Sequence, residues 1–282
     1  CLAILLAVAA VCLVKKGGWP RTLAGVVLLA LCMGIYQAYA AVAVALSLLV
    51  VLRECLNTRS TLKGTVRLGF RLVGFLAVGA GLYYGILQIF LTVKDLELLD
   101  YLGMSDAGSG YPIARIPSLI LSTYKQLILF FFWPNGTNTF TTPLLAVLNW
   151  AALALALVCF LAIVRRRTLW REPWRVVGAL VLAALLPLAV GFAQIISPFS
   201  DATPIMKYAY VLVYAAVLMV ADQGLSLLPR PRAGAVASGA LALCMACVTL
   251  YCANINNLLY TASEQAHRAT LSYATRLLSR IE

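Results

Sequence analysis

The sequence predicts an all-α, polytopic transmembrane helical bundle. Its 282 residues are 63% hydrophobic and only 11% charged, and their mean hydropathy is +0.93. A single soluble core cannot bury so much apolar surface. Apolar runs long enough to cross a bilayer recur along the chain. We expect about eight passes, including a hairpin of short helices, with an interfacial helix and a carboxyl-terminal amphipathic helix outside the bilayer.

The first apolar run, residues 1–14, ends at Lys15 and Lys16. It starts at Cys1 with neither a Met nor a basic segment before it, which differs from a secretory signal peptide. We therefore expect residues 1–14 to be the end of a membrane span, and the chain to be an excerpt of a longer protein.

The next apolar stretch, residues 23–52, is interrupted by Gly34-Ile35-Tyr36-Gln37-Ala38-Tyr39. As one helix it would be about 45 Å long, which exceeds the ~30 Å hydrocarbon core. One interpretation is a single, strongly tilted helix. The other is a hairpin of two half-length helices, residues 23–34 and 38–52, whose polar tip lines a cavity. We favour the hairpin, because it agrees better with the distribution of charge described below.

The later elements follow from apolar runs bounded by basic or turn residues. A short apolar run at 119–133 ends in aromatic residues, which predicts an interfacial helix. Pro187 predicts a kink in the span that contains it. The domain prediction is a transmembrane domain of residues 1–257 and an extracytoplasmic amphipathic helix of residues 258–282. The remaining predicted spans are 72–93, 143–164, 176–197, 205–228 and 235–254, with a basic loop at 53–71 and a polar loop at 94–118.

The charge distribution supports this topology. With the hairpin and the interfacial helix, 15 of the 22 basic residues fall on one side of the membrane and give that side a net charge of +12. A single span over residues 23–52 would lower the split of basic residues to 12 against 10, and a span at 119–133 would lower it to 12 against 9. Excess Lys and Arg mark cytoplasmic loops. The basic charge therefore predicts orientation in a plasma membrane, and we exclude a nucleic-acid partner.

The cysteines and the histidine do not predict a metal site. Most of the eight Cys lie within apolar runs, where Cys behaves as a small hydrophobe. Cys244 and Cys247 form a C-x-x-C pattern, but it lies within a predicted span and has no second ligand pair. His267 is read as a surface residue. We assign no cofactor and leave the requirement for a divalent metal open.

Polar side chains within the predicted spans gather toward the outer half of the membrane. Gln and Lys are costly there and indicate a cavity or pathway, although an aromatic belt at the membrane surface is an alternative interpretation for the Tyr residues. The middle of the membrane carries no charged residue, which argues against an ion-coupled transporter. The polar set is Tyr36, Gln37, Tyr39, Tyr83, Tyr84, Gln88, Gln194, Ser197, Lys207, Tyr208 and Tyr210, with loop residues Arg115, Lys125, Ser200, Asp201 and Thr203.

The segment Gly34-Ile35-Tyr36-Gln37-Ala38-Tyr39 resembles the L-G-x-Y-Q-x-[YF] signature of bacterial polytopic glucosyltransferases of the Gtr type II family. Residues 264–282 are similar to an outer helix of that family. The resemblance implies a GT-C-like enzyme in the bacterial inner membrane that transfers glucose from a polyprenyl-phosphate sugar to a surface polysaccharide. It also implies catalytic carboxylates in a first outer loop, for which this chain has no matching segment, so we expect the catalytic base to lie upstream.

The predicted chemistry assigns roles to the polar set. A departing lipid phosphate needs cations at the outer interface, and an acceptor hydroxyl needs a carboxylate base. Asp201 is the candidate for that base, although a plain loop residue near Lys207 is the simpler interpretation. The substrate-binding prediction comprises Arg115, Lys125 and Lys207 as phosphate contacts, Tyr36 and Gln37 at the sugar or cavity wall, and Tyr39, Tyr83, Tyr84, Gln88 and Tyr208 around them.

Two other functional classes remain open at this point. A polysaccharide polymerase, ligase or flippase would also carry polar clusters at the outer face, but it would be expected to show a large outer loop rich in Arg or His. A non-catalytic membrane protein of envelope assembly would also fit. The predicted partners of the favoured enzyme are the lipid bilayer, the polyprenyl-phosphate sugar donor and a surface polysaccharide acceptor.

Overall fold

A computed structural model describes residues 2–95, 116–133, 142–196, 204–227 and 231–278. Every regular element in these ranges is helical, which confirms the predicted all-α fold. The chain divides into two compact units, of which the first comprises Cys1–Ile128 and Leu155–Leu227 and the second Leu129–Ala154 and Leu228–Glu282. Six helices in the described ranges are long and apolar enough to cross a membrane, in agreement with a polytopic bundle.

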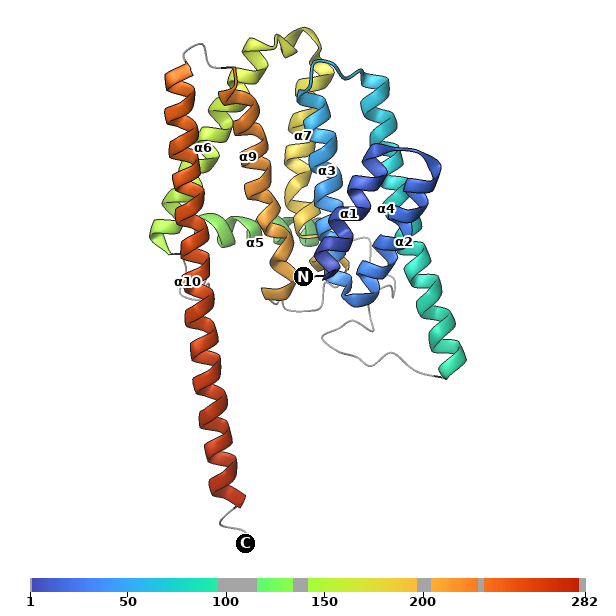
Figure 1. The fold of residues 1–282 in the computed structure, drawn as a ribbon, viewed down its shortest axis with the longest axis vertical. Coiled ribbons are helices and arrows are strands. Elements are labelled where there is room, and N and C mark those ends of the chain that lie inside the picture. Colours follow the sequence, from blue (N-terminus) through green and yellow to red (C-terminus); the bar gives the residue numbers. More distant parts are fainter. Residues whose placement is uncertain (1, 96–115, 134–141, 197–203, 228–230, 279–282) are drawn as a thin grey trace. The chain divides into compact units, whose positions relative to one another are not determined.

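The chain forms a succession of α-helices and short 3₁₀ helices, the latter marked η (Figure 1). In chain order they are α1 Leu2–Lys16, α2 Trp19–Ile35, η1 Gln37–Tyr39, α3 Ala40–Leu56, α4 Leu62–Lys94, α5 Ile116–Phe132, α6 Pro143–Arg166, η3 Leu169–Arg171, α7 Pro173–Val190, α8 Phe192–Ile196, η4 Pro204–Tyr210, α9 Val211–Leu225 and α10 Pro231–Leu278.

The helical conformation is interrupted between α2 and α3, as the polar residues within the apolar stretch predicted. Tyr36 has an extended backbone with φ −163° and ψ 118°, and the 3₁₀ turn Gln37–Tyr39 follows it. The alternative of one continuous tilted helix is therefore wrong. Both helices are longer than predicted, at 17 residues each, or about 26 Å. They extend past the apolar run because Pro is tolerated in the first turn of α2, and Arg and Glu are good helix formers at the end of α3.

The two arms of this hairpin pack mainly against other helices. α2 packs chiefly on α1 and α4, whereas α3 packs chiefly on α7. Gly79 of α4 makes the α2 contact close, because a Cβ at that position would lie 2.6 Å from Leu29 Cδ2. Small residues at helix interfaces are typical of membrane bundles, where they allow backbones to approach. The two arms of the hairpin thus have different main neighbours.

Two hydrogen bonds from arginines join basic helix ends of the first unit to neighbouring helices. Arg71 Nη2 donates to the Lys15 carbonyl at 3.1 Å, and Arg167 Nη1 donates to the Leu56 carbonyl at 2.6 Å. The first contact joins α4 to the end of α1, and the second joins the residue after α6 to the end of α3 (top of Figure 1). The helix break at Tyr36 lies at the other end of α3.

The predicted loop at residues 53–71 is wrong over its second half. α4 begins at Leu62, where Thr61 accepts a hydrogen bond from the Gly64 N–H as an N-cap, and it continues for 33 residues to Lys94. Lys63, Arg67 and Arg71 are therefore helical. The prediction began this helix too late because it ended the apolar run at charged residues. Lys and Arg are good helix formers, and the Thr61 cap allows the helix to begin before the apolar run.

The last two predicted elements form one helix. α10 runs for 48 residues from Pro231 to Leu278, about 72 Å, which exceeds the ~30 Å hydrocarbon core. The predicted domain boundary between residues 257 and 258 lies inside it. Part of α10 must therefore extend beyond a bilayer that it crosses. The extracytoplasmic position of residues 258–282 stays a prediction.

The helix that contains Pro187 ends soon after it. α7 stops at Val190, where the Gly191 N–H donates to the Pro187 carbonyl at 2.9 Å, and the five-residue helix α8 follows. The predicted span 176–197 is thus divided in two. The following span also begins irregularly, because the 3₁₀ helix η4 precedes α9. Three short segments, η1, α8 and η4, consequently gather at one end of the first unit, where both α8 and η4 contact η1.

Candidate functional site

A hydrogen bond joins the helix break to the middle of α4. Gln37 Nε2 donates to Tyr83 Oη at 2.6 Å, and both side chains are half-buried. The extended backbone at Tyr36 ends α2 and lets the next residues turn back toward α4. A Gln side chain within an apolar bundle needs such a partner, because an unsatisfied buried amide is costly.

Aromatic rings continue the cluster from η1 to η4. The rings of Tyr36 and Tyr39 meet edge to face with centroids 5.4 Å apart, and the rings of Tyr39 and Tyr208 are tilted with centroids 5.7 Å apart. Both separations are within the range of favourable aromatic pairs. Residues far apart in the sequence thus form one continuous surface of tyrosines.

A buried polar pair lies next to this surface. Gln194 of α8 is buried, and its Nε2 donates to the hydroxyl of the buried Tyr210 at 3.5 Å. The Gln194 Oε1 atom is also buried and has no hydrogen-bond partner among the described residues. An orphan acceptor of this kind is rare in folded proteins. The contact with Tyr210 thus satisfies one end of this buried amide and leaves its other end unpaired among the described residues.

Lys207 brings a cation to the same short segment. Its side chain is half-buried on η4, between the buried residues Met206 and Ala209. η4 contacts both η1 and α3, so Lys207 belongs to the segment that supplies Tyr208 to the tyrosine surface. We call Tyr36, Gln37, Tyr39, Tyr83, Gln194, Lys207, Tyr208 and Tyr210 the break cluster.

The structure does not bring every predicted substrate-binding residue into the break cluster. Tyr84 is 59% exposed, because successive residues on a helix point about 100° apart and Tyr83 occupies the inward direction. Gln88 and Lys125 are also exposed. Arg115 and Asp201 lie outside the described residues.

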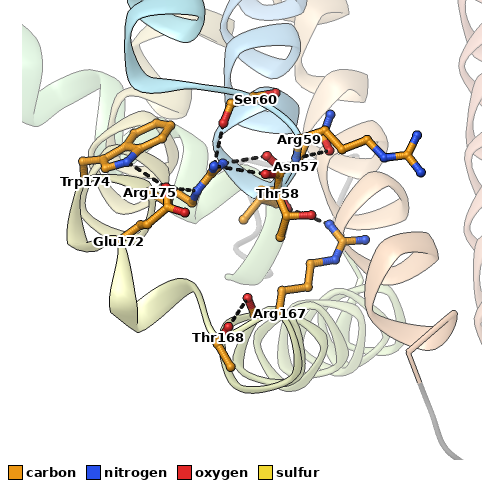
Figure 2. A network of polar contacts seen from close by, with 10 residues as sticks. Asn57, Thr58, Arg59, Ser60, Arg167, Thr168, Glu172, Trp174 and Arg175 are labelled. Atoms are coloured by element: carbon orange, nitrogen blue, oxygen red, sulfur yellow. Dashed lines mark hydrogen bonds and ion pairs between the residues drawn. The ribbon is translucent and has the colours of Figure 1, made fainter.

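A second polar network at the other end of the first unit was missed by sequence reasoning (Figure 2). Arg175 is only 2% exposed. Its Nη1 donates to the Asn57 carbonyl at 2.6 Å, its Nη2 donates to the Ser60 carbonyl at 2.5 Å, and its Nε pairs with Glu172 Oε2 at 2.8 Å. This guanidinium binds backbone carbonyls of the connection between α3 and α4, from the C-cap Asn57 to Ser60, and holds that connection against the start of α7.

Arg167 completes this network from the end of α6. Its Nη1 donates to the Leu56 carbonyl at 2.6 Å and to Gln223 Oε1 at 2.8 Å. Cations are favourable at the negative end of a helix dipole. In the sequence analysis Arg167 and Arg175 were counted only among the 15 basic residues on one side of the membrane, and no local pattern distinguishes them from their exposed neighbours. Their role is structural, since all the described contacts tie helix ends together.

The five acidic residues within the described ranges lie outside the break cluster. Glu54 and Glu172 lie at the end of the first unit that carries Arg167 and Arg175, which we call the arginine end. There Glu54 accepts a hydrogen bond from Ser60, and Glu172 accepts one from Arg175. Asp95 is twelve residues beyond Tyr83 on α4, about 18 Å along the helix. Asp222 lies in the last turn of α9, and Glu264 lies on α10. No group of three or more potential metal ligands occurs within the described ranges.

Comparison with known proteins identifies one family. A family model described as "Glucosyl transferase GtrII" matches residues 1–220, which include the whole break cluster. No curated protein and no solved structure matches the chain.

Proposed function

The chain belongs to the GtrII glucosyl transferase family, and from this premise we propose that it moves glucose from a polyprenyl-phosphate sugar to a surface glycan at the break cluster. It is a membrane glycosyltransferase, as the family and the apolar helices indicate. The family match favours this activity over the polymerase, flippase and scaffold alternatives. The donor, the acceptor and the roles of the residues below belong to the proposal.

The observation that carries the proposal is the Gln37–Tyr83 hydrogen bond within the break cluster. An amide and phenol hydroxyls both donate and accept hydrogen bonds, so they suit the alternating donors and acceptors of sugar hydroxyls. Tyrosine rings add flat apolar surface beside these polar groups. The buried Gln194 amide adds a further polar side chain beside these rings. These features fit a sugar better than a purely hydrophobic ligand.

Lys207 is proposed as the contact for the donor phosphate. A phosphate that leaves the sugar gains negative charge, and a positioned cation stabilises that charge in the transition state. Lys binds phosphate as a point charge and does so best where water is partly excluded. Lys207 meets this requirement because it is half-buried beside the tyrosine surface. Arg115 and Lys125 remain proposed auxiliary cations.

The acceptor hydroxyl needs a general base, for which a carboxylate is the expected group. None of the five described acidic residues belongs to the break cluster, as their positions show. We therefore propose that the base comes from outside the described ranges. Asp201 is the candidate in this sequence, since it precedes Lys207 by six positions. Its role rests on this proximity along the chain alone.

The proposed reaction takes place on the outer face of a bacterial plasma membrane. The break cluster lies at the end of α3 opposite to the basic helix ends, and basic ends mark the cytoplasmic side. A helix of about 26 Å is shorter than the ~30 Å hydrocarbon core, so α2 favours local thinning of the bilayer. Thinning brings a lipid-linked phosphate closer to the break cluster. In this orientation α10 ends outside the cell.

The proposal is tested by supplying two labelled glucose donors to the full-length protein in vesicles with its acceptor glycan. Polyprenyl-phosphate glucose should label the glycan without any nucleotide sugar. UDP-glucose alone should give no label, because it lacks the lipid that enters from the bilayer. Label from UDP-glucose in the absence of lipid donor would contradict the proposal.

A further inference from the structure

An open cavity of about 360 Å³ extends along α3 from Leu46 to Arg53, toward the end of the helix opposite to the break cluster. It is formed by α1, α3 and α9 and has no part in the proposed transfer reaction. Its volume is within the range of small-ligand sites. The residues that line it are Lys15, Leu46, Leu49, Val50, Arg53, Met219, Asp222 and Gln223.

The lining residues show that the cavity is long and polarised. The four from α3 occupy positions i, i+3, i+4 and i+7, and the three from α9 occupy i, i+3 and i+4, so each set forms one face of its helix. Leu46 and Arg53 are separated by about 10 Å along α3. Apolar side chains line the part farther from the helix ends, whereas the charged side chains lie at the ends. This is the polarity of a lipid with its headgroup at the membrane surface.

The charged groups in the wall have opposite signs and are not paired with one another. Lys15 and Arg53 are cations, and Asp222 is an anion. Within the described ranges, the ion pairs of 4.0 Å or less are Arg175–Glu172 and Arg268–Glu264. The cavity therefore presents two cations and one carboxylate that are available to a ligand. A ligand that carries both a negative and a positive group would pair with the cations and with the carboxylate.

Gln223 joins the wall of the cavity to Arg167. Its Oε1 accepts from Arg167 Nη1 at 2.8 Å. Because a guanidinium only donates, this contact fixes which end of the amide carries the oxygen. The Nε2 atom is buried and has no hydrogen-bond partner among the described residues. This N–H therefore lies behind the cavity wall and not on its surface. The lining groups suited to an anionic oxygen are the cations Lys15 and Arg53.

We propose that this cavity binds the phosphoethanolamine headgroup of an aminophospholipid. The phosphate is held by Lys15 and Arg53, and the ammonium group is held by Asp222. The glycerol and first acyl carbons lie along Leu46, Leu49 and Met219. A headgroup with a phosphate alone would leave Asp222 facing like charge, which is unfavourable. A soluble phosphoethanolamine would leave the apolar wall uncovered, so the lipid is the better match.

The test measures lipid retention by native mass spectrometry of the full-length protein, with phosphatidylethanolamine or phosphatidylglycerol of identical acyl chains. We expect the protein to retain phosphatidylethanolamine about fivefold better, and Asp222→Asn to abolish that preference. Asp95→Asn is the matched control, because Asp95 is exposed at the end of α4 and outside the cavity. Lys15→Gln should weaken retention of both lipids. Gel filtration verifies that each variant remains folded.

Three results would overturn the proposal. Equal retention of the two lipids by the unaltered protein would show that the ammonium group is not recognised. A preference that survives Asp222→Asn would place recognition elsewhere. Displacement of the lipid by an equal concentration of soluble glycerophosphoethanolamine would show that the site takes a free headgroup. None of these results depends on glucose transfer, so the proposed function is tested separately.

Discussion

Gln37 Nε2 and Tyr83 Oη form a 2.6 Å hydrogen bond between two residues that are 46 positions apart. Gln37 lies where the backbone leaves the helical conformation, and Tyr83 lies within the long helix α4. The bond thus holds an irregular segment against a rigid element, which is the arrangement expected of a pre-organised binding site.

The first prediction concerns this bond. Tyr83→Phe removes the hydroxyl and leaves the Gln37 amide without its partner. A net hydrogen bond is worth about 1 kcal/mol, so we expect kcat/KM for the lipid donor to fall roughly five- to tenfold. Tyr84→Phe is the matched control, since Tyr84 is the exposed neighbour on the same helix. Initial rates of transfer by the full-length protein measure both. Equal losses in the two variants would contradict a specific role for Tyr83.

The second prediction concerns the cation of the break cluster. Lys207→Met should lower kcat for transfer about 10- to 100-fold, because a charge-assisted contact is worth about 1.5–3 kcal/mol. Lys207→Arg should restore part of the activity by keeping the charge. Lys63→Met, an exposed cation in the first turn of α4, should have no effect. If Lys207→Met retained full activity, another residue would have to contact the phosphate.

The third prediction concerns the buried arginine. Arg175→Lys should destabilise the protein by about 3 kcal/mol, because one ammonium group cannot replace a guanidinium that serves three backbone carbonyls and a carboxylate. Arg171→Lys is the control, since Arg171 is exposed. Thermal unfolding in detergent measures the difference. Identical melting temperatures for the two variants would refute the structural role of Arg175.

The fourth prediction concerns the turn between α1 and α2. Gly17 has φ +77°, and a Cβ there would lie 2.9 Å from Arg71 Nη1. Gly17→Ala should therefore cost about 1–2 kcal/mol of stability. Gly34→Ala is the control, because nothing lies within 4 Å of a Cβ at that position and Ala favours a helix over Gly. The same unfolding assay applies. A Gly17→Ala protein as stable as the control would show that the turn adopts another conformation.

The sequence was sufficient for the fold class and for the position of the helix break, because hydropathy and a polar interruption are local properties. The lengths of the helices were harder to predict from the sequence. The start of α4 at Leu62 depends on a cap by Thr61, and charged residues such as Arg67 lie within the helix although they end the apolar run.

The residues of the candidate site could also be predicted only in part from the sequence. Tyr36, Gln37 and Tyr39 could be grouped from the sequence because they are adjacent, and Lys207 and Tyr208 because they begin a span. The choice of Tyr83 over Tyr84 depends on the rotation of α4 about its axis, which packing on α2 determines. The burial of Arg175 depends on carbonyls more than a hundred positions away, and no pattern near Arg175 reports them.

The most direct test of the central claim is photo-crosslinking of the full-length protein with a polyprenyl-phosphate glucose that carries a diazirine on the sugar. The account predicts that label appears on residues 36–39 and 204–210, and that excess unmodified donor removes it. Competed label confined to the opposite end of the first unit, around Arg53 and Asp222, would contradict the account, because the donor would then bind away from the break cluster.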